Sequence, residues 1–296
     1  MQKFTVVAAL MISAAAPAMA LEFGPGFYAN GKFALEYLDS GSSSGSTFGF
    51  ADADIGYEQE GGGFGAFVGL LGFQSEGESV TSLYGAISYS GDFGKIQIGA
   101  PRNAIDDYFK TPDIGGSSLL GLEVGQLSGS ILPLAALQSD ETPLGLRYDG
   151  SFGAIKLGVS YHTIDDAEVV DVAMNYQLGE TVLRAGAENL SGSGFSETSY
   201  FLGAEGKLGP VTGGIVFADL GVIGVTSTQV YAVYSPIEAL DLTATYLAIK
   251  PEGGSTQDGY GLDAKYTFNP GVYVGAGYLG NLFESGTYSL AVGIEF

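Results

Sequence analysis

Residues capable of catalysis are scarce in this chain. It has a single histidine, His162, and no cysteine among 296 residues. A zinc site or a Ser–His–acid centre needs several convergent groups of these types. The sequence therefore argues against an enzyme, and we expect His162 to be an ordinary residue in the wall of a sheet.

Carboxylates are the abundant reactive groups. The chain has 33 acidic and 11 basic residues, with a formal net charge of -22. This balance excludes nucleic acid as a partner, because phosphates require a basic surface. The pairs Asp106-Asp107 and Asp165-Asp166 have two readings: they are Ca²⁺ ligands from flexible loops, or solvated acids that keep a mouth negative. The second is favoured, and no other metal or cofactor is predicted.

One segment, 101–141, combines charged and apolar side chains over about forty residues, a length that is uncommon for a structureless loop and usually functional. Its leucines and isoleucines give it something to bury, so it is not a disordered tail. We expect it to fold into an enclosed space and narrow it, with these residues at the constriction: Arg102, Asp106, Asp107, Lys110, Asp113 and Glu123.

The rest of the chain must position this segment, and its pattern is that of strands. In the last eleven residues, Tyr288, Leu290, Val292, Ile294 and Phe296 alternate with small or polar residues. Successive side chains of a strand lie on opposite faces. The same one-sided apolar pattern recurs along most of the chain, so its apolar faces need an apolar solvent. In lipid, the sheet that survives is a closed one.

The pattern predicts an all-β fold, a barrel of sixteen antiparallel strands in a single domain, 21–296. The predicted strands are 27–38, 47–59, 64–74, 80–90, 93–100, 142–150, 153–163, 168–178, 181–189, 198–208, 211–219, 226–236, 240–249, 258–268, 271–280 and 286–296.

The predicted connections alternate between two kinds. Tight turns are expected at Gly61-Gly62-Gly63, Gly91-Asp92, Gly150-Ser151, Gly179-Glu180, Gly209-Pro210 and Asn269-Pro270-Gly271. Longer polar loops are expected at 39–46, 75–79, 164–167, 190–197 and 250–257. Short turns at one rim and long loops at the other are typical of outer-membrane barrels.

Alternation also assigns the faces. Tyr161 and Tyr266 are placed toward lipid, and the strand 64–74 is apolar on both faces, which indicates subunit contact outside or packing on an inserted loop inside. The charged residues assigned to the inner wall are Lys32, Glu36, Asp52, Asp54, Glu58, Lys95, Arg147 and Lys156.

The N-terminus has the pattern of a targeting signal. Residues 1–20 combine Lys3, an apolar run from Val6 to Ala16 and a small-x-small ending at Ala20. This pattern predicts a Sec-type signal peptide, 1–20, cleaved after Ala20. Removal of Lys3 leaves ten basic and 33 acidic residues in the exported chain.

Several motifs together resemble one family. They are the stretch from Gly91 to Gly99 (GDFGKIQIG), the long acidic insertion after it, the sixteen strands and the terminal Phe296. In combination they are similar to a general diffusion porin of Gram-negative bacteria, most of all to the Rhodobacter-type porins of alphaproteobacteria. The resemblance covers the whole exported chain.

The resemblance implies an outer-membrane homotrimer whose third loop forms an eyelet and whose channel passes small hydrophilic solutes and ions. Lipid and lipopolysaccharide would surround it, and Phe296 resembles the signal read by the outer-membrane insertion machinery. One departure stands out. Porins of this kind usually set several arginines on the early strands against the acidic loop, whereas here Lys32 is the one base on the first two strands.

This surplus of acids predicts a cation-selective channel, because charges that line a water-filled constriction bias which ions enter. Lys95, Arg102, Arg147, Lys156 and Arg184 are the other bases available to form a displaced field. Two alternatives stay open: a substrate-specific outer-membrane channel and, with less support, a barrel enzyme or adhesin.

Overall fold

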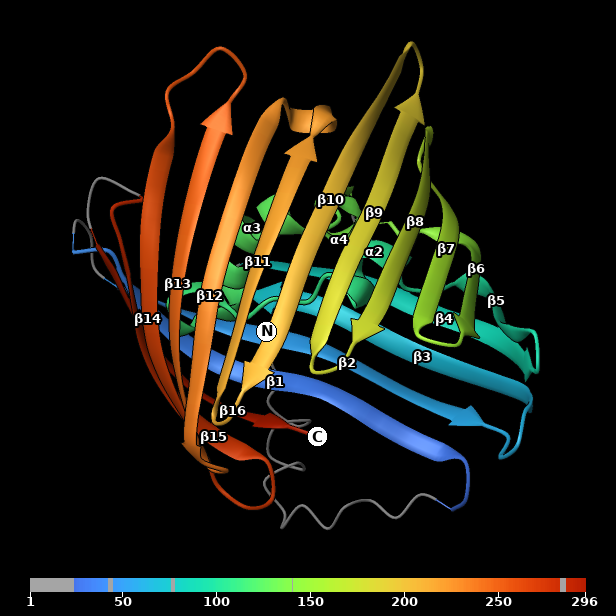
Figure 1. Cartoon of the computed structure of the whole chain (residues 1–296), viewed down its shortest axis with the longest axis horizontal. Helices are drawn as coiled ribbons and strands as arrows, with labels where there is room; N and C mark the ends of the chain where they lie inside the picture. Colours follow the sequence, from blue (N-terminus) through green and yellow to red (C-terminus); the bar gives the residue numbers. More distant parts are fainter. Residues whose placement is uncertain (1–23, 42–44, 76–77, 140, 283–285) are drawn as a thin grey trace.

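The computed structural model describes residues 24–296 except 42–44, 76–77, 140 and 283–285. The predicted signal peptide, 1–20, lies outside the described residues. The chain forms a closed antiparallel barrel in which each strand pairs with its neighbours in sequence and β1 pairs with β16 (Figure 1). The strands are β1 (Phe27–Asp39), β2 (Ser46–Glu58), β3 (Gly63–Gln74), β4 (Ser79–Gly91), β5 (Gly94–Ala100), β6 (Leu144–Phe152), β7 (Ile155–Ile164), β8 (Ala167–Leu178), β9 (Thr181–Gly192), β10 (Phe195–Leu208), β11 (Val211–Leu220), β12 (Val225–Ile237), β13 (Leu240–Pro251), β14 (Gln257–Thr267), β15 (Val272–Gly280) and β16 (Thr287–Glu295).

The first and last strands close the barrel. Their register pairs Lys32 with Glu295 and Tyr37 with Leu290. Beyond this ladder, the Gly31 and Phe296 backbones exchange two hydrogen bonds, of 2.9 and 3.1 Å. Closure leaves no row of unpaired N–H and C=O groups, which lipid cannot satisfy. The predicted fold class of sixteen antiparallel strands is confirmed.

Three of the predicted connections were wrong in detail. Gly150 and Ser151 belong to β6 and pair with Leu157 and Lys156, so the turn lies two residues later, at Gly153. The loops predicted at 164–167 and 190–197 are tight hairpins, because β7 and β8 include Ile164 and Ala167, and β9 and β10 extend through a polar stretch to Gly192 and from Phe195. Asp165 and Gly194 have φ of 50° and 87°, as such turns require. Loop length therefore separates the two rims less cleanly than the sequence suggested.

The face assignment follows the predicted alternation. On β1, Leu35 is 44% exposed, whereas its neighbour Glu36 is 1% exposed. On β7, Tyr161 is exposed and His162 is buried. The exposed apolar side chains form the outer surface, which is stable in a hydrocarbon solvent.

Between β5 and β6 the chain forms short helices separated by irregular segments. These are α2 (Ala104–Tyr108), η1 (Ile114–Gly116), α3 (Ser118–Gly125), η2 (Gln126–Ser128) and α4 (Leu132–Ser139); η3 (Gly221–Ile223) lies between β11 and β12. We call residues 101–143 the inserted segment. In Figure 1 its helices are drawn within the ring of strands. No helix in the described ranges is long and apolar enough to cross a membrane.

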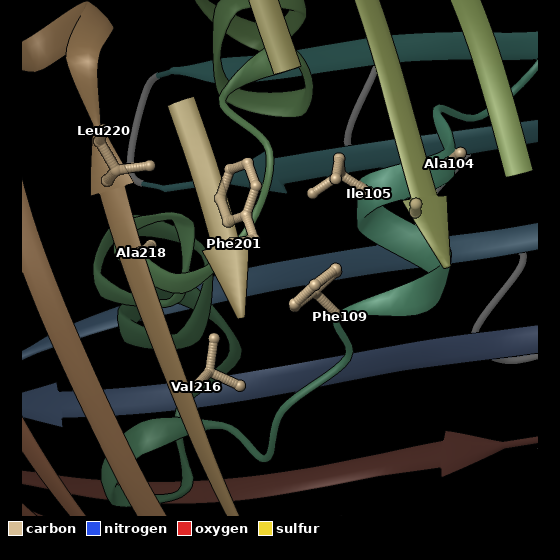
Figure 2. Close-up of a cluster of buried hydrophobic side chains, with 8 residues drawn as sticks. Ala104, Ile105, Phe109, Phe201, Val216, Ala218 and Leu220 are labelled. Carbon is tan, nitrogen blue, oxygen red and sulfur yellow. The ribbon is translucent and has the colours of Figure 1, made fainter. Parts of the chain in front are cut away.

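The inserted segment packs against inward side chains on several sides of the barrel. In Figure 2, Ile105 and Phe109 lie toward Phe201 of β10 and Val216 of β11, and all four side chains are buried. Three further apolar clusters join the segment to the wall, around Leu137, Ile114 and Leu132. These contacts explain its leucines and isoleucines: they bury apolar surface against the inside of the barrel.

The apolar inner face of β3 belongs to one of these clusters. Phe67, Leu71 and Phe73 pack with Leu119 and Leu137 of the inserted segment. On the opposite face of β3, Phe64 and Val68 are exposed. Packing on a segment inside the barrel thus accounts for the inner apolar face of this strand.

Two wall glycines allow the segment to approach closely. A Cβ at Gly277 would lie 2.0 Å from the carbonyl oxygen of Gly115, and one at Gly186 would lie 2.5 Å from Cδ1 of Ile105. The Gly115 backbone excludes a side chain at Gly277, and a side chain at Gly186 would require Ile105 to shift. The backbone of η1 and the side chains of α2 therefore rest directly on the wall at these points.

Candidate channel constriction

A cavity of about 650 Å³ lies between the inserted segment and the inner wall of β1 to β6. Tyr28, Phe50, Phe67 and Phe109 contribute aromatic surface to it. Five acids and five bases line the same space: Asp52, Asp54, Asp106, Asp107 and Asp113, with Lys32, Lys95, Arg102, Lys110 and Arg147. The cavity is therefore lined both by residues of the wall and by residues of the inserted segment, as expected for a constriction.

Arg102 connects the start of the segment to β2. Its Nη2 lies 2.5 Å from Oδ1 of Asp52, and its Nε lies 2.9 Å from Oδ2 of Asp54. The guanidinium also lies over the ring of Tyr84, 4.6 Å from the centroid. Such a planar cation suits both a bidentate carboxylate pair and an aromatic face.

Arg147 of β6 holds the next part of the segment. It forms an ion pair with Asp107 and a second with Asp149, with 2.7 Å between Nη2 and Oδ1. Its Nη1 donates to the carbonyl oxygens of Arg102 and Asn103, at 3.1 and 3.2 Å. Burial raises the pKa of Asp107, but the charges of Arg147 and Lys110 and the hydrogen bonds from both together outweigh burial, and the pKa lies below its ordinary value.

Three lysines complete the paired charges of the cavity. Lys32 Nζ lies 2.7 Å from Oδ2 of Asp113 and near the rings of Phe50 and Tyr273. Lys95 pairs with Glu58. Lys110, whose side chain is 74% exposed, lies 3.2 Å from Asp107. Every base that lines the cavity is thus in an ion pair.

Asp106 differs from the other acids of the cavity. Within the described residues it forms no hydrogen bond or ion pair, although it lines the same space. Burial raises its pKa to about 7, with a further increase from the neighbouring charge of Asp107. Its charge therefore changes near neutral pH.

Other predicted residues lie elsewhere. Glu36 is buried beneath the segment, where it accepts hydrogen bonds from the backbone N–H of Ser118 and the hydroxyl of Ser117, both at 2.9 Å. Lys156 is exposed and forms no ion pair with the described residues. The side chain of Glu123 lies outside the described residues. Phe296 is 45% exposed and stacks on Phe33, with 5.7 Å between ring centroids.

The expected shortage of bases does not extend to the cavity. On the first two strands the sequence set Lys32 alone against the acids, and in the structure Arg102, Lys110 and Arg147 converge with it on the same space. Arg102 and Lys110 come from the inserted segment itself. Their positions depend on the path of that segment, which alternation along strands does not reveal.

Sequence reasoning also missed three kinds of contact that hold the segment. Asp171 accepts hydrogen bonds from the backbone N–H groups of Ala104 and Ile105, at 3.0 and 3.2 Å. Ser227 and Ser289 donate to the carbonyl oxygens of Leu127 and Gly115. His162 Nε2 lies 2.9 Å from the carbonyl oxygen of Pro101. Their inward positions on strands were the available signal.

No metal site emerges from the acids. Within the ranges that the structure describes, no group of three or more His, Asp or Glu side chains is arranged to hold a metal ion. Asp107 is occupied by Arg147 and Lys110, and the backbone N–H of Asp165 donates to Glu141 at 2.9 Å. Calcium at Asp106-Asp107 or Asp165-Asp166 stays an untested expectation.

Comparison with known proteins places this arrangement in a family. The model of the Gram-negative porin family matches residues 5–281. The chain belongs to the Gram-negative porin family. Its structure is similar to two solved mutants of the Rhodopseudomonas blastica porin, with TM-scores of 0.67 and 0.68. Each comparison has 19% identity and covers 91% of this chain and 100% of the other. A search of curated proteins found no significant match.

Membership of the porin family confirms several predictions from the sequence. The protein is an outer-membrane channel of the β-barrel class, similar to Rhodobacter-type porins, and not an enzyme. The buried His162, with a neighbouring carbonyl oxygen as its partner, fits a wall residue. The signal peptide, the solutes and the selectivity of this porin are matters of prediction.

Proposed function

We propose that this porin forms a water-filled channel for the passive diffusion of small hydrophilic solutes and ions, constricted by the inserted segment. The observation that carries the proposal is the cavity between that segment and β1 to β6, lined by ten charged side chains. Charged walls retain water and accept polar solutes without a dedicated binding site. No residue that binds a solute by itself needs to be invoked.

We further propose that the channel is weakly cation-selective. The paired charges of the cavity act as short dipoles, whose fields fall quickly with distance. The bias would come from Asp106 and from the loop rim, where Asp39, Asp166 and Glu252 outweigh Lys250. Charges at a mouth raise the local concentration of the opposite ion, and salt screens this effect over about 10 Å at 0.1 M.

The test is single-channel recording of the refolded protein in a planar bilayer, with reversal potentials in a salt gradient. We expect ohmic conductance and a reversal potential of the cationic sign that shrinks as salt rises. Conductance that saturates with one solute would favour the alternative, a substrate-specific channel. A reversal potential of the anionic sign would show that Lys110 and the other bases dominate the field in the channel. The proposed cation selectivity would then be wrong.

Assembly as a homotrimer in lipid and lipopolysaccharide, after handling by the insertion machinery, is proposed from the family resemblance. The exposed apolar side chains on the outer face of β1 to β5, such as Leu35, Val68 and Ile87, provide surface for either lipid or a second copy. Mass measurement in mild detergent distinguishes a trimer from a monomer. A monomer that conducts normally would contradict the trimer and leave the channel function intact.

A further inference from the structure

Glu188 of β9 is a buried carboxylate that contacts the inserted segment at two places far apart in sequence. It is 1% exposed. Its Oε2 accepts from Nδ2 of Asn103 at 3.4 Å and from the hydroxyl of Ser130. Its Oε1 faces the backbone N–H of Ile131, also at 3.4 Å. One wall residue thus binds the segment before α2 and again before α4.

We propose that Glu188 is a positioning residue that holds two stretches of the inserted segment, at Asn103 and at Ser130, to the wall and so fixes the width of the constriction. The inference rests on the proposed channel function. Between Asn103 and Ser130 the chain carries Asp106, Asp107, Lys110 and Asp113, which are the segment's charged residues in the cavity besides Arg102. Their place relative to the wall depends on where this stretch begins and ends.

Both contact points lead directly into helices. Asn103 precedes Ala104, the first residue of α2, whose backbone N–H is bound by Asp171. Ser130 also accepts a hydrogen bond from the backbone N–H of Leu132 at 3.0 Å, at the start of α4. Loss of Glu188 would therefore loosen the approach to both helices at once.

The other buried wall acids bind one stretch of the segment each. Glu36 holds Ser117 and Ser118, and Asp171 holds Ala104 and Ile105. Among the described carboxylates, Glu188 is the one that joins two separate stretches. A buried polar group that loses its partner is left unsatisfied, and in a network this affects every member.

The test compares wild-type, Glu188→Gln and Glu295→Gln full-length porins by single-channel recording. Glu295 is the matched control: it is an inward acid paired with Lys265 at 3.0 Å, and none of its hydrogen bonds reaches the described part of the inserted segment. We expect Glu188→Gln to raise the share of open time spent in substates about tenfold, equivalent to about 1.4 kcal/mol. Glu295→Gln should keep the steady wild-type level.

A reciprocal exchange separates positioning from general stability. Asn103→Asp alone sets two carboxylates against each other and should also give an unsteady level. Combined with Glu188→Gln, it restores an amide facing a carboxylate, and the steady level should return. Barrel folding is followed in each variant by circular dichroism and by mobility before and after heating.

Two results would overturn the inference: Glu188→Gln recordings that match those of Glu295→Gln, or an exchange variant as unsteady as the single variants. If Glu188→Gln does not fold, Ser130→Ala removes one of the hydrogen bonds to Glu188 and should give a smaller change of the same kind. Recordings of Ser130→Ala that match the wild type would also overturn the inference. A wild type that forms no channel would instead refute the proposed function itself.

Discussion

Arg102 of the inserted segment binds Asp54 of β2 through two nitrogens, with 2.9 Å from Nε to Oδ2 and 3.0 Å from Nη2 to Oδ1. The same guanidinium reaches Asp52 at 2.5 Å. One cation of the segment thus offsets half of the charge of these two aspartates of β2. The acidic surplus of the sequence is consequently much reduced inside the cavity.

This relationship predicts the effect of Arg102→Gln. Two aspartates lose their cation, so the cavity becomes negative and cation selectivity should increase. A unit charge about 4 Å away in water is worth about 1 kcal/mol, which corresponds to roughly a fivefold rise in the cation-to-anion permeability ratio. Reversal potentials in a salt gradient measure it. Lys207→Gln, an equal charge loss at an exposed end of β10, is the control and should change little.

The raised pKa of Asp106 predicts that the ion selectivity of the channel depends on pH. Its raised pKa, about 7, means that the carboxyl group is neutral below this pH and charged above it. The groups that act on it are Asp107, Arg102, Asp52 and Lys110. Because the charge appears as the pH rises, cation selectivity should increase between about pH 6 and pH 8.

Asp106→Asn is the variant that isolates this effect. It should abolish the change in reversal potential over that range and leave conductance near the wild-type value. Asp113→Asn is a matched comparison, because it removes an aspartate that is paired with Lys32. A pH dependence that persists in Asp106→Asn would assign the titration to another group.

The strands could be predicted because each one places alternate side chains toward an apolar solvent and toward the inside of the barrel. Leu35 and Glu36 differ in exposure for the reason that alternation gives: one faces an apolar solvent and the other the inside of the barrel. The pairing of the first strand with the last followed from the even strand count. The hairpin at Gly194 was missed because its strand ends are polar, and polarity was read as loop; at Asp165 the two strands are longer than predicted by one residue each, Ile164 and Ala167.

The site could be predicted only as a set of residue types. Glu36 and Asp52 look alike in sequence, as inward acids on neighbouring strands. In the structure Glu36 binds the N–H of Ser118, whereas Asp52 faces the cavity and Arg102. The difference comes from contacts between residues far apart in sequence, which depend on how the inserted segment packs. A local pattern carries no information about that packing.

Removal of roughly 105–135 should raise single-channel conductance, because these residues form most of the segment's helices, which pack against the inner wall. It should also destabilise the barrel. Phe201 and Phe73, buried against the segment, would face water, at about 1.5–3 kcal/mol for each large side chain. The mobility shift on heating should therefore occur at a lower temperature. Unchanged conductance would contradict the proposed role of the segment as the constriction.

The C-terminus makes two separable contributions, and two variants distinguish them. Deletion of Phe296 removes both the ring and the backbone bonds to Gly31, of 2.9 and 3.1 Å, whereas Phe296→Ala removes the ring that stacks on Phe33 and keeps those bonds.

If the aromatic ring is the signal that the insertion machinery reads, both variants should insert poorly in cells. Refolding in detergent should be near normal for Phe296→Ala and weaker for the deletion, because two closing hydrogen bonds are worth about 1–3 kcal/mol together. The comparison is made on the amounts of heat-modifiable barrel recovered from outer membranes and from detergent. Equal losses of Phe296→Ala in cells and in detergent would make Phe296 a residue of barrel stability, with no separate role in recognition.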